Sequence, residues 1–275
     1  MRAAAEQGNV AASESTGYRY TWGKGTEKNS SEGFRWYLAA AEADDASAGY
    51  WVGRAYQFGR GVETNLVEAT KWFRQSAELG YARAQNSLGH RYEKGEGVEQ
   101  DLVEAVKWYR AAAEQGNLPS MCNLAVCLKK GRGVATNTLE AVQWYTAAAE
   151  KGHARAQNGL GYCYKDGVGV ERDPEEAVKW FRLAAEQGYH HAEDSLAECY
   201  YKGEGVELDY ALAMEWFAKA ADAGNEYSMN WLGLMHLNGH GVETNRAAAL
   251  EWFQKAAKEG HAEAKEHLSN FAAVE

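Results

Sequence analysis

Proline is scarce in this chain, with only two residues among 275. Because proline interrupts helices, this scarcity favours a helical protein. The sequence also lacks any run of about 18 consecutive apolar residues, the length that a membrane-spanning helix needs. Hydrophobic residues nevertheless make up 45% of the chain. We therefore expect a helical protein with a substantial core and no membrane span.

Positive charge is scarce as well. The 29 lysines and arginines are outnumbered by 39 aspartates and glutamates, which gives a formal net charge of −10. Non-specific affinity for nucleic acids comes largely from clustered Lys and Arg. This balance argues against a nucleic-acid partner.

Familiar catalytic motifs are missing. The sequence contains neither S-x-x-K nor G-x-S-x-G, and neither H-E-x-x-H nor C-x-x-C. His190 and His191 are adjacent, so on a helix they point about 100° apart and form no chelating pair. The carboxylates recur in phase as helix caps and helix-face charges, which is not the pattern of an acid/base pair. We predict no catalytic residues, no metal site and no cofactor.

What the sequence does contain is an internal repeat. A tryptophan recurs every 36 residues without a slip, at Trp36, Trp72, Trp108, Trp144, Trp180, Trp216 and Trp252. A fixed period of 20 to 50 residues is typical of a solenoid, in which each small unit buries its apolar face against its neighbours. We expect the repeated tryptophan to hold each junction between units.

The second half of each unit is predicted to be a helix, called here a second-type helix. In residues 173–188 the apolar positions follow the i, i+3, i+4, i+7, i+8 spacing of one helix face. Asp173 is the predicted N-cap, with Pro174 at the first helical position and Glu176 completing a capping box. The same start recurs as Asn65/Glu68, Asp101/Glu104 and Asn137/Glu140. A glycine at a position suited to positive φ ends the helix, at Gly80, Gly116, Gly152, Gly188, Gly224 and Gly260.

The first half of each unit is the partner, a first-type helix. Ala156, Leu160 and Tyr164 are spaced by four residues, and Gly161 leaves room for another backbone to approach. Gly167 and Gly169 form a G-x-G that we interpret as the turn between the two helices. A G-x-G can also cradle phosphate, but that use requires a preceding strand and a third glycine, which are absent here.

The recurring pattern is A-x-A-x-x-x-L-G-x-x-Y-x-x-G-x-G-V-x-x-D-x-x-E-A-x-x-W-F-x-x-A-A-x-x-G. It resembles the Sel-1-like repeat family, a relative of the tetratricopeptide repeats. The resemblance implies an all-α, right-handed superhelical solenoid of helix-turn-helix repeats whose first-type helices line a concave surface. It also implies a role as an adaptor or scaffold. We expect about fifteen helices, eight of the first type and seven of the second.

A single solenoid is expected to span residues 1–275. Residues 2–8 repeat residues 110–116 letter for letter, so we interpret residues 1–8 as the tail of a preceding repeat whose beginning is missing. Seven repeats follow over 9–260, and a terminal helix over 261–275. A signal peptide would lie upstream, which leaves a periplasmic, secreted or cytoplasmic location open. The first full repeat is the weakest, because Thr26, Gly33 and Asp44 replace the usual valine, alanine and glycine.

The four cysteines are not expected to form disulfides. Cys127, Cys163 and Cys199 occupy one position in successive repeats, about 9 Å or more apart, whereas bridged Cα atoms lie within ~7 Å. Cys122 and Cys127 are five residues apart on one helix and do not face each other. We expect buried, reduced cysteines.

Positions that do not repeat indicate the binding surface. The face of the first-type helices opposite Leu160 carries aromatic, basic and amide residues, which are common at interfaces. Trp51 and Trp231 lie at its margin and have an alternative role, packing between neighbouring helices. The predicted site residues are Tyr50, Trp51, Arg54, Arg83, Asn86, His90, Arg155, Asn158, Tyr162, Tyr201, Tyr227, Asn230 and Trp231.

The predicted function is a non-enzymatic scaffold that binds a protein or peptide in its concave groove. Asn86, Asn158 and Asn230 share one position and would clamp a ligand backbone, as first-helix asparagines do in related tetratricopeptide arrays; the alternative is that they bond within the array or to water. Two other functions stay open: a hydrolase of a cell-wall-like ligand, suggested by cysteine-rich relatives discussed as penicillin-binding proteins, and a structural spacer. A monomer is expected, although the oligomeric state is open.

Overall fold

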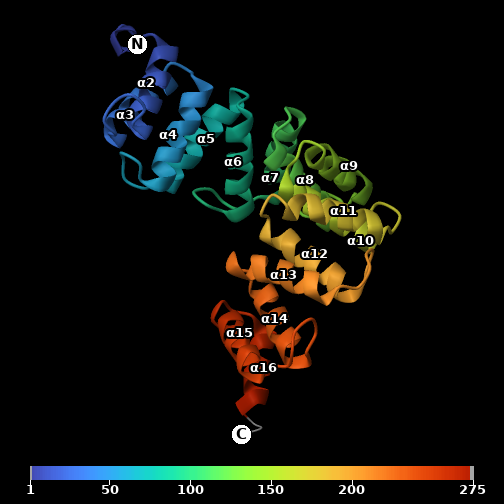
Figure 1. Ribbon diagram of the computed structural model, residues 1–275. Helices are drawn as coiled ribbons and strands as arrows, with labels where there is room; N and C mark the ends of the chain where they lie inside the picture. Colours follow the sequence, from blue (N-terminus) through green and yellow to red (C-terminus); the bar gives the residue numbers. More distant parts are fainter. Residues whose placement is uncertain (1, 273–275) are drawn as a thin grey trace. The chain divides into compact units, whose positions relative to one another are not determined.

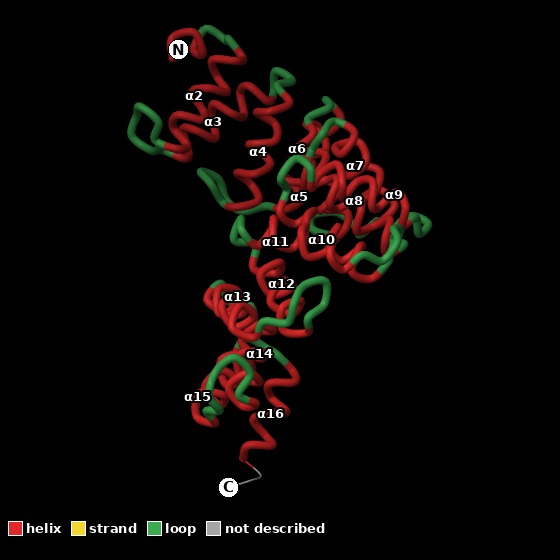
Figure 2. The backbone as a smooth tube through the Cα atoms, turned by 45° about the vertical axis from the view of Figure 1, so that its right-hand side comes forward, coloured by secondary structure: helices red, strands yellow, loops and turns green. Residues whose placement is uncertain are grey.

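A computed structural model describes residues 2–272 and confirms the all-α class. In this part of the chain there are sixteen helices and no strand (Figure 2). The helix beyond the expected fifteen is the short α1 (Arg2–Glu6), which falls within the predicted tail of a preceding repeat. Residue 1 of that tail and residues 273–275 of the predicted terminal helix lie outside the described residues.

The helices group into two compact units, residues 1–137 and 138–275, and each is described by itself (Figure 1). In the first unit the first-type helices are α2 (Val10–Trp22), α4 (Ala46–Phe58), α6 (Ala82–Lys94) and α8 (Leu118–Lys130). Its second-type helices are α1, α3 (Ser30–Ala41), α5 (Leu66–Glu78) and α7 (Leu102–Glu114). In the second unit the first-type helices are α10 (Ala154–Asp166), α12 (His190–Lys202), α14 (Glu226–Asn238) and α16 (Ala262–Ala272). Its second-type helices are α9 (Thr138–Ala149), α11 (Pro174–Ala185), α13 (Tyr210–Asp222) and α15 (Arg246–Lys258).

Within each unit every helix packs against the one before it and the one after it in sequence. This nearest-neighbour packing is the arrangement of a helical-repeat solenoid, in which each repeat contacts only its neighbours.

The predicted caps are present. Asn65 and Asp101 each accept two backbone N–H groups of the first helical turn, and Asp173 accepts from the N–H of Glu176 at 2.9 Å. The glycines that follow the second-type helices all have positive φ, from 76° to 109°. These contacts satisfy donors and acceptors that a helix end leaves without partners.

The predicted capping boxes are wrong in one respect. The backbone N–H of Asp173 donates to the carbonyl of Tyr164, at 2.9 Å, so it needs no glutamate. Glu176 pairs instead with Lys179, one turn further along α11, at 2.8 Å. Glu104 and Lys107 form the same pair in α7. The first-type helix therefore takes over the bond that a capping-box glutamate would make.

The centre of each repeat is the aromatic residue that directly follows the repeated tryptophan. Tyr37, Phe73, Tyr109, Tyr145, Phe181, Phe217 and Phe253 are at most 3% exposed, whereas every repeated tryptophan is only partly buried. Trp72, Trp216 and Trp252 pack against the core from its edge, so the expectation that the tryptophan holds each junction stays a prediction, with the following aromatic residue at the centre. Two consecutive residues of a helix point about 100° apart, and it is the second of them that points into the core.

A glycine of the first-type helix makes room for this ring. A Cβ placed on Gly161 would lie 2.6 Å from the ring of Phe181, and one on Gly89 would lie 2.8 Å from the ring of Tyr109. Gly161 was expected to admit another backbone, but its nearest neighbours are ring atoms. The close approach thus serves side-chain packing between the two helices of one repeat.

The two glycines of each G-x-G turn have different neighbours. Both have positive φ, and the first, such as Gly203, forms the C-cap of its helix. The second approaches the preceding repeat: a Cβ on Gly205 would lie 2.2 Å from the carbonyl oxygen of Pro174, at the start of α11. Likewise, a Cβ on Gly97 would lie 2.0 Å from the carbonyl oxygen of Leu66, at the start of α5. The turn therefore also forms an inter-repeat contact that the sequence analysis did not anticipate.

The irregular residues of the first full repeat have structural consequences. Asp44, in place of the usual glycine, is the one non-glycine residue with positive φ in the described part of the chain, at 61°. Gly33, in place of the usual alanine, leaves space that Thr21 fills, since a Cβ there would lie 2.2 Å from Thr21 Oγ1. A non-glycine residue at positive φ costs free energy, which agrees with this repeat being the weakest.

All four cysteines are free and buried, as the sequence predicted. Burial raises the pKa of the Cys127 and Cys199 thiols to about 11. These two thiols are therefore protonated at neutral pH and pack as small apolar groups.

Replacing Phe181 with alanine is expected to cost about 3 to 5 kcal/mol in the free energy of unfolding, because it removes a fully buried ring. Replacing the adjacent Trp180 should cost less, because that side chain is only partly buried. Urea unfolding followed by circular dichroism measures both. A larger loss for Trp180→Ala than for Phe181→Ala would contradict the assignment of the core residue.

Alanine at Gly205 is expected to cost about 1 to 3 kcal/mol more than alanine at Gly203, because it overpacks the contact with Pro174. Both positions have positive φ, so the backbone strain of the two variants is matched. Thermal unfolding of the two variants gives the comparison. Equal losses would show that the second glycine is needed only for its backbone conformation.

Candidate functional site

The predicted site residues differ in exposure. Arg83, His90, Arg155 and Tyr227 are exposed, whereas Trp51, Arg54, Asn86, Tyr162, Tyr201 and Trp231 are partly buried. Tyr50, Asn158 and Asn230 are buried, with 6%, 8% and 4% exposure, so their predicted place on an open face is wrong. The reason for Tyr50 is that its ring packs against Phe73 and Tyr81, with ring centroids 5.9 and 5.5 Å away. The binding role of the set stays a prediction.

The asparagines belong to a ladder of polar residues that connects successive first-type helices. Ladder position here means residue 14 and every 36th residue after it. At this position Asn86 accepts from the hydroxyl of Ser120 at 2.8 Å, and Asp194 accepts from Ser228 at 2.6 Å. Glu14 likewise accepts from Ser47 at 2.7 Å. These bonds are of the kind expected in the alternative to a backbone clamp, in which the side chains bond within the array.

Asn230 is the exception in this ladder. Its Oδ1 atom is buried and has no hydrogen-bond partner among the described residues. The serines that donate to Asn86 and Asp194 lie 34 residues after them in the sequence. The residue 34 positions after Asn230 is Ala264, which is fully buried and has no hydroxyl. The missing hydroxyl accounts for the unpaired amide oxygen, which lowers stability relative to a paired one.

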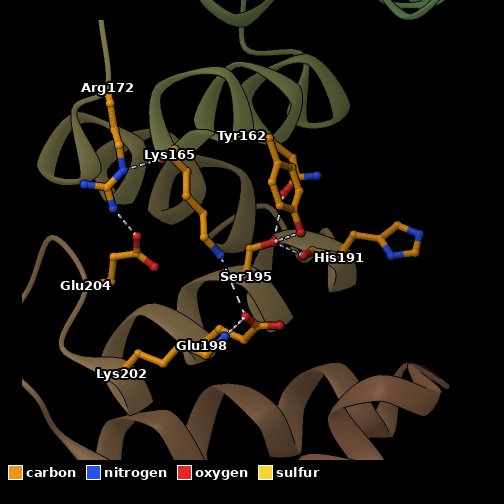
Figure 3. Close-up of polar contacts among 9 residues, drawn as sticks. Tyr162, Lys165, Arg172, His191, Ser195, Glu198, Lys202 and Glu204 are labelled. Atoms are coloured by element: carbon orange, nitrogen blue, oxygen red, sulfur yellow. Dashed lines mark hydrogen bonds and ion pairs between the residues drawn. The ribbon is translucent and has the colours of Figure 1, made fainter. Parts of the chain in front are cut away.

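In the second unit the site is a network between α10 and α12 (Figure 3). Ser195 Oγ lies 2.8 Å from the Tyr162 hydroxyl and 3.5 Å from Asn158 Oδ1. Glu198 pairs with Lys165 at 3.7 Å and with Lys202 at 2.6 Å. The network fixes the side chains of two adjacent repeats relative to each other.

Arg172 and His191 lie at the sides of this network (Figure 3). Arg172 pairs with Glu204 at 2.6 Å, which adds a further link between successive repeats. The His191 ring points away from Ser195, which meets only the backbone carbonyl of His191. Burial, and then His190, lowers the pKa of His191, so the ring is neutral at neutral pH.

Asp194 is the buried carboxyl group of this face. Burial raises its pKa from 3.8 to about 6, although the hydrogen bond from Ser228 acts in the opposite direction. Glu198 and Glu226 raise the pKa further and Lys165 lowers it. The adjacent Glu193 also has a raised pKa, again mainly through burial. This face therefore carries less negative charge near pH 6 than its composition suggests.

Trp51 and Trp231 pack between helices, as in the alternative interpretation of these two residues. The ring of Trp51 stacks on Tyr37 with a centroid distance of 6.0 Å, and that of Trp231 stacks on Phe217 at 5.7 Å. Each therefore covers the central aromatic residue of the preceding second-type helix. Gly159 occupies the same repeat position in α10 and has no side chain to do so.

Tyr210 and His240 extend the site and were missed by the sequence analysis. His240 Nδ1 lies 2.7 Å from the Tyr201 hydroxyl, and its ring stacks on Tyr210 at 4.6 Å. A signal was available, because Glu93 and Arg132 occupy the same two repeat positions and pair at 3.1 Å. Residues 39 positions apart thus meet across adjacent repeats in these two cases, whereas Lys165 and Glu204, at the same two repeat positions, pair with Glu198 and Arg172.

Neither a metal-ligand cluster nor a membrane-spanning helix is present among the described residues. They contain no group of three or more His, Cys, Asp or Glu placed to hold a metal ion. None of the described helices is both long and apolar enough to cross a membrane.

The raised pKa of Asp194 predicts how stability depends on pH. The folded protein binds this proton more tightly than the unfolded chain, so the contribution of Asp194 is greatest below pH 3.8 and is lost as the pH rises through about 6. A difference of about 2 pH units corresponds to roughly 3 kcal/mol. Asp194→Asn should therefore gain stability relative to the wild type over this window by roughly 2 to 3 kcal/mol. Urea midpoints across the window, with the exposed Asp222→Asn as control, measure it. Parallel pH profiles for Asp194→Asn and wild type would contradict the assignment.

Comparison with known proteins agrees with this architecture. The model of the Sel1 repeat matches seven consecutive segments, residues 11–45, 46–81, 82–117, 118–153, 154–189, 190–225 and 226–261. A search of curated proteins found no match.

Two solved structures are similar over most of the chain. A Sel1 repeat protein from Oxalobacter formigenes is 35% identical with a TM-score of 0.83, covering 89% of this chain and 96% of its own. A protective antigen present in uropathogenic Escherichia coli strains, which displays an SLR fold, is 34% identical with a TM-score of 0.84. That match covers 98% of this chain and 58% of the antigen, so the chain spans less than two thirds of the antigen's length. With seven matched repeats, the chain belongs to the Sel1 repeat family.

Proposed function

We propose that this protein is a non-enzymatic scaffold that binds a protein or peptide on the surface of its first-type helices. Sel1 repeat solenoids are typically scaffolds for protein interactions, which supports the general class. The observation that carries the proposal is the contrast between the two helix types. Central positions of the second-type helices repeat from unit to unit, whereas the outward positions of the first-type helices vary much more: the position of Tyr162 is held in other repeats by Arg54, His90, Glu198 and Leu234.

The surface has the composition and rigidity that recognition requires. Tyr162, Tyr201 and Tyr227 combine large apolar rings with a hydroxyl group, and Arg155, on the same helix as Tyr162, adds positive charge. Ser195 and Glu198 form bonds between adjacent helices that hold this face in one arrangement. A partner binding here would therefore lose little affinity to ordering of the surface.

Two alternatives make different predictions. A hydrolase would show turnover in a substrate screen, and a substitution on this face would abolish that turnover. A structural spacer would bind no partner on this face and would tolerate substitutions there. The ladder position favours neither alternative, since its hydrogen bonds serve packing between repeats in either case.

The test uses two exposed residues of this face, Arg155 and Tyr227. Partners captured from lysate and secreted fractions of the source organism by the wild type would be identified by mass spectrometry, and the strongest one titrated by calorimetry. The double variant Arg155→Ala/Tyr227→Ala should bind it about tenfold or more weakly, as loss of interface arginine and tyrosine commonly does.

The matched control replaces Lys179 and Leu183, two exposed residues of the second-type helix α11, with alanine. This double variant should bind the partner as tightly as the wild type, and both variants should keep the wild-type melting temperature. Equal losses in the two variants, or no captured partner, would contradict the proposed surface.

A further inference from the structure

A patch of two arginines and two aromatic rings lies at the C-terminal ends of α2 and α4. These two helices are labelled in Figure 1. The Arg60 patch, as it is called here, consists of Trp22, Arg54, Phe58 and Arg60. Trp22 and Phe58 occupy the same repeat position, as the last residues of their helices, and are 41% and 50% exposed. Large apolar side chains this exposed are a feature of interaction surfaces when they are grouped.

The arginines cover the rings closely. The Arg60 guanidinium carbon lies 5.2 Å from the ring centroids of both Trp22 and Phe58. The Arg54 guanidinium carbon lies 4.8 Å from the centroid of Phe58. Both cations thus lie within cation–π distance of one ring, and both arginine side chains are partly exposed.

Arg54 is anchored at one side only. Its Nη1 donates to the Tyr50 hydroxyl at 2.9 Å, whereas its Nε atom is buried without a hydrogen-bond partner among the described residues. Behind it lies a shallow crevice lined by Thr21, Phe34, Tyr37, Trp51, Arg54, Ala55 and Arg60. A ligand would therefore lie across the rim of this crevice, against the guanidinium groups.

The positive charge of the patch is not neutralised by the protein. Within the described residues neither Arg54 nor Arg60 has a carboxylate in ion-pairing distance. Of the other charged residues at the repeat position of Arg60, Glu96 pairs with Arg91, Arg132 with Glu93, and Glu204 with Arg172, whereas Lys24 has no ion pair within the described residues. After burial as the main cause, Arg54 contributes to lowering the pKa of the neighbouring Arg91. The patch is a site of unpaired positive charge on a chain of net charge −10.

We propose that the Arg60 patch binds an acidic segment of a partner protein in which carboxylates alternate with aromatic or aliphatic side chains. The guanidinium groups match carboxylates in geometry and charge, and the exposed rings of Trp22 and Phe58 contact the apolar side chains between them. The inference rests on the proposed function and names a partner chemistry for a surface in the first unit.

A peptide fits this patch better than a nucleic acid does. An extended polyanion would bring many phosphates against a chain whose net charge is −10, and two arginines would neutralise few of them. A short acidic segment places only one or two carboxylates here and uses its apolar side chains for the rest of the contact.

The probe is a short fluorescein-labelled peptide of alternating glutamate and tryptophan, titrated with the whole protein by fluorescence anisotropy. The double variant Arg54→Gln/Arg60→Gln should bind it about tenfold or more weakly than the wild type, because both carboxylate contacts are lost. Trp22→Ala should also weaken binding, and added salt should weaken it for the wild type.

The control variant is Arg35→Gln/Lys107→Gln, which removes the same number of positive charges from second-type helices of the same unit. It should bind the probe as the wild type does, and melting temperatures should agree among the variants. Equal loss in this control, equal binding of the peptide with glutamine for glutamate, equal binding of a thymidine oligonucleotide, or no binding of the acidic probe would each overturn the inference.

The outcome is separable from that of the proposed function. If Arg155→Ala/Tyr227→Ala weakens a captured partner while the acidic probe does not bind, the scaffold proposal stands and the Arg60 patch proposal fails. If the probe binds through Arg54 and Arg60 while no partner depends on Arg155 and Tyr227, the Arg60 patch proposal is supported and the proposed binding surface in the second unit is contradicted.

Discussion

The rest of the structure depends on one packing contact in each repeat, between the buried aromatic ring of the second-type helix and the first-type helix. Phe181 is fully buried, and its ring occupies the space that a Cβ on Gly161 would need. In this repeat the absence of a side chain at Gly161 lets the ring lie directly against the first-type helix; Ala125 and Ala197, which hold the same position in two other repeats, are the next smallest residues and are fully buried. Buried residues such as Leu160 and Ala184 complete the core around the ring, and each pair of helices depends on this core and on the neighbouring repeats.

A rigid core frees the outer positions of the first-type helices to vary. Asn86 and Asp194 show how this variation remains compatible with the fold, since each accepts a hydrogen bond from a serine hydroxyl of the next first-type helix. Glu198 on α12 likewise links two first-type helices, through an ion pair with Lys165 on α10. The outer side chains of the first-type helices are therefore held by the core beneath them and by the adjacent first-type helix. On the surface that we propose for binding, the charged groups that lack an ion pair are the ones available to a partner, and Arg54 and Arg60 have no carboxylate in ion-pairing distance within the described residues.

The sequence was sufficient for the features that depend on local chemistry. The N-cap of Asp173 and the positive φ of Gly188 follow from residue types at known helix ends, and the period gives the pairing of helices. Exposure was predicted less well. A helical wheel gives the direction of Asn158 from its own axis, but whether that direction is open depends on the neighbouring helix. The Arg60 patch shows the same limit, because Arg60 lies in a turn and meets Trp22 only through the packing of adjacent repeats.

The second glycine of each turn ties the spacing of the repeats to an exact count of residues. Gly205 lies against the start of α11 and Gly97 against the start of α5, and every turn from Gly61 to Gly241 meets the preceding second-type helix in this way. The first turn differs, because Gly25 lies against Arg19 of its own repeat. A deletion or duplication of one whole repeat, such as unequal recombination produces, recreates this contact at the new junction. A change of any other length does not. Arrays of this kind can therefore lengthen and shorten during evolution in whole repeats while the outward residues diverge, which explains how neighbouring repeats come to share a core and present different surfaces.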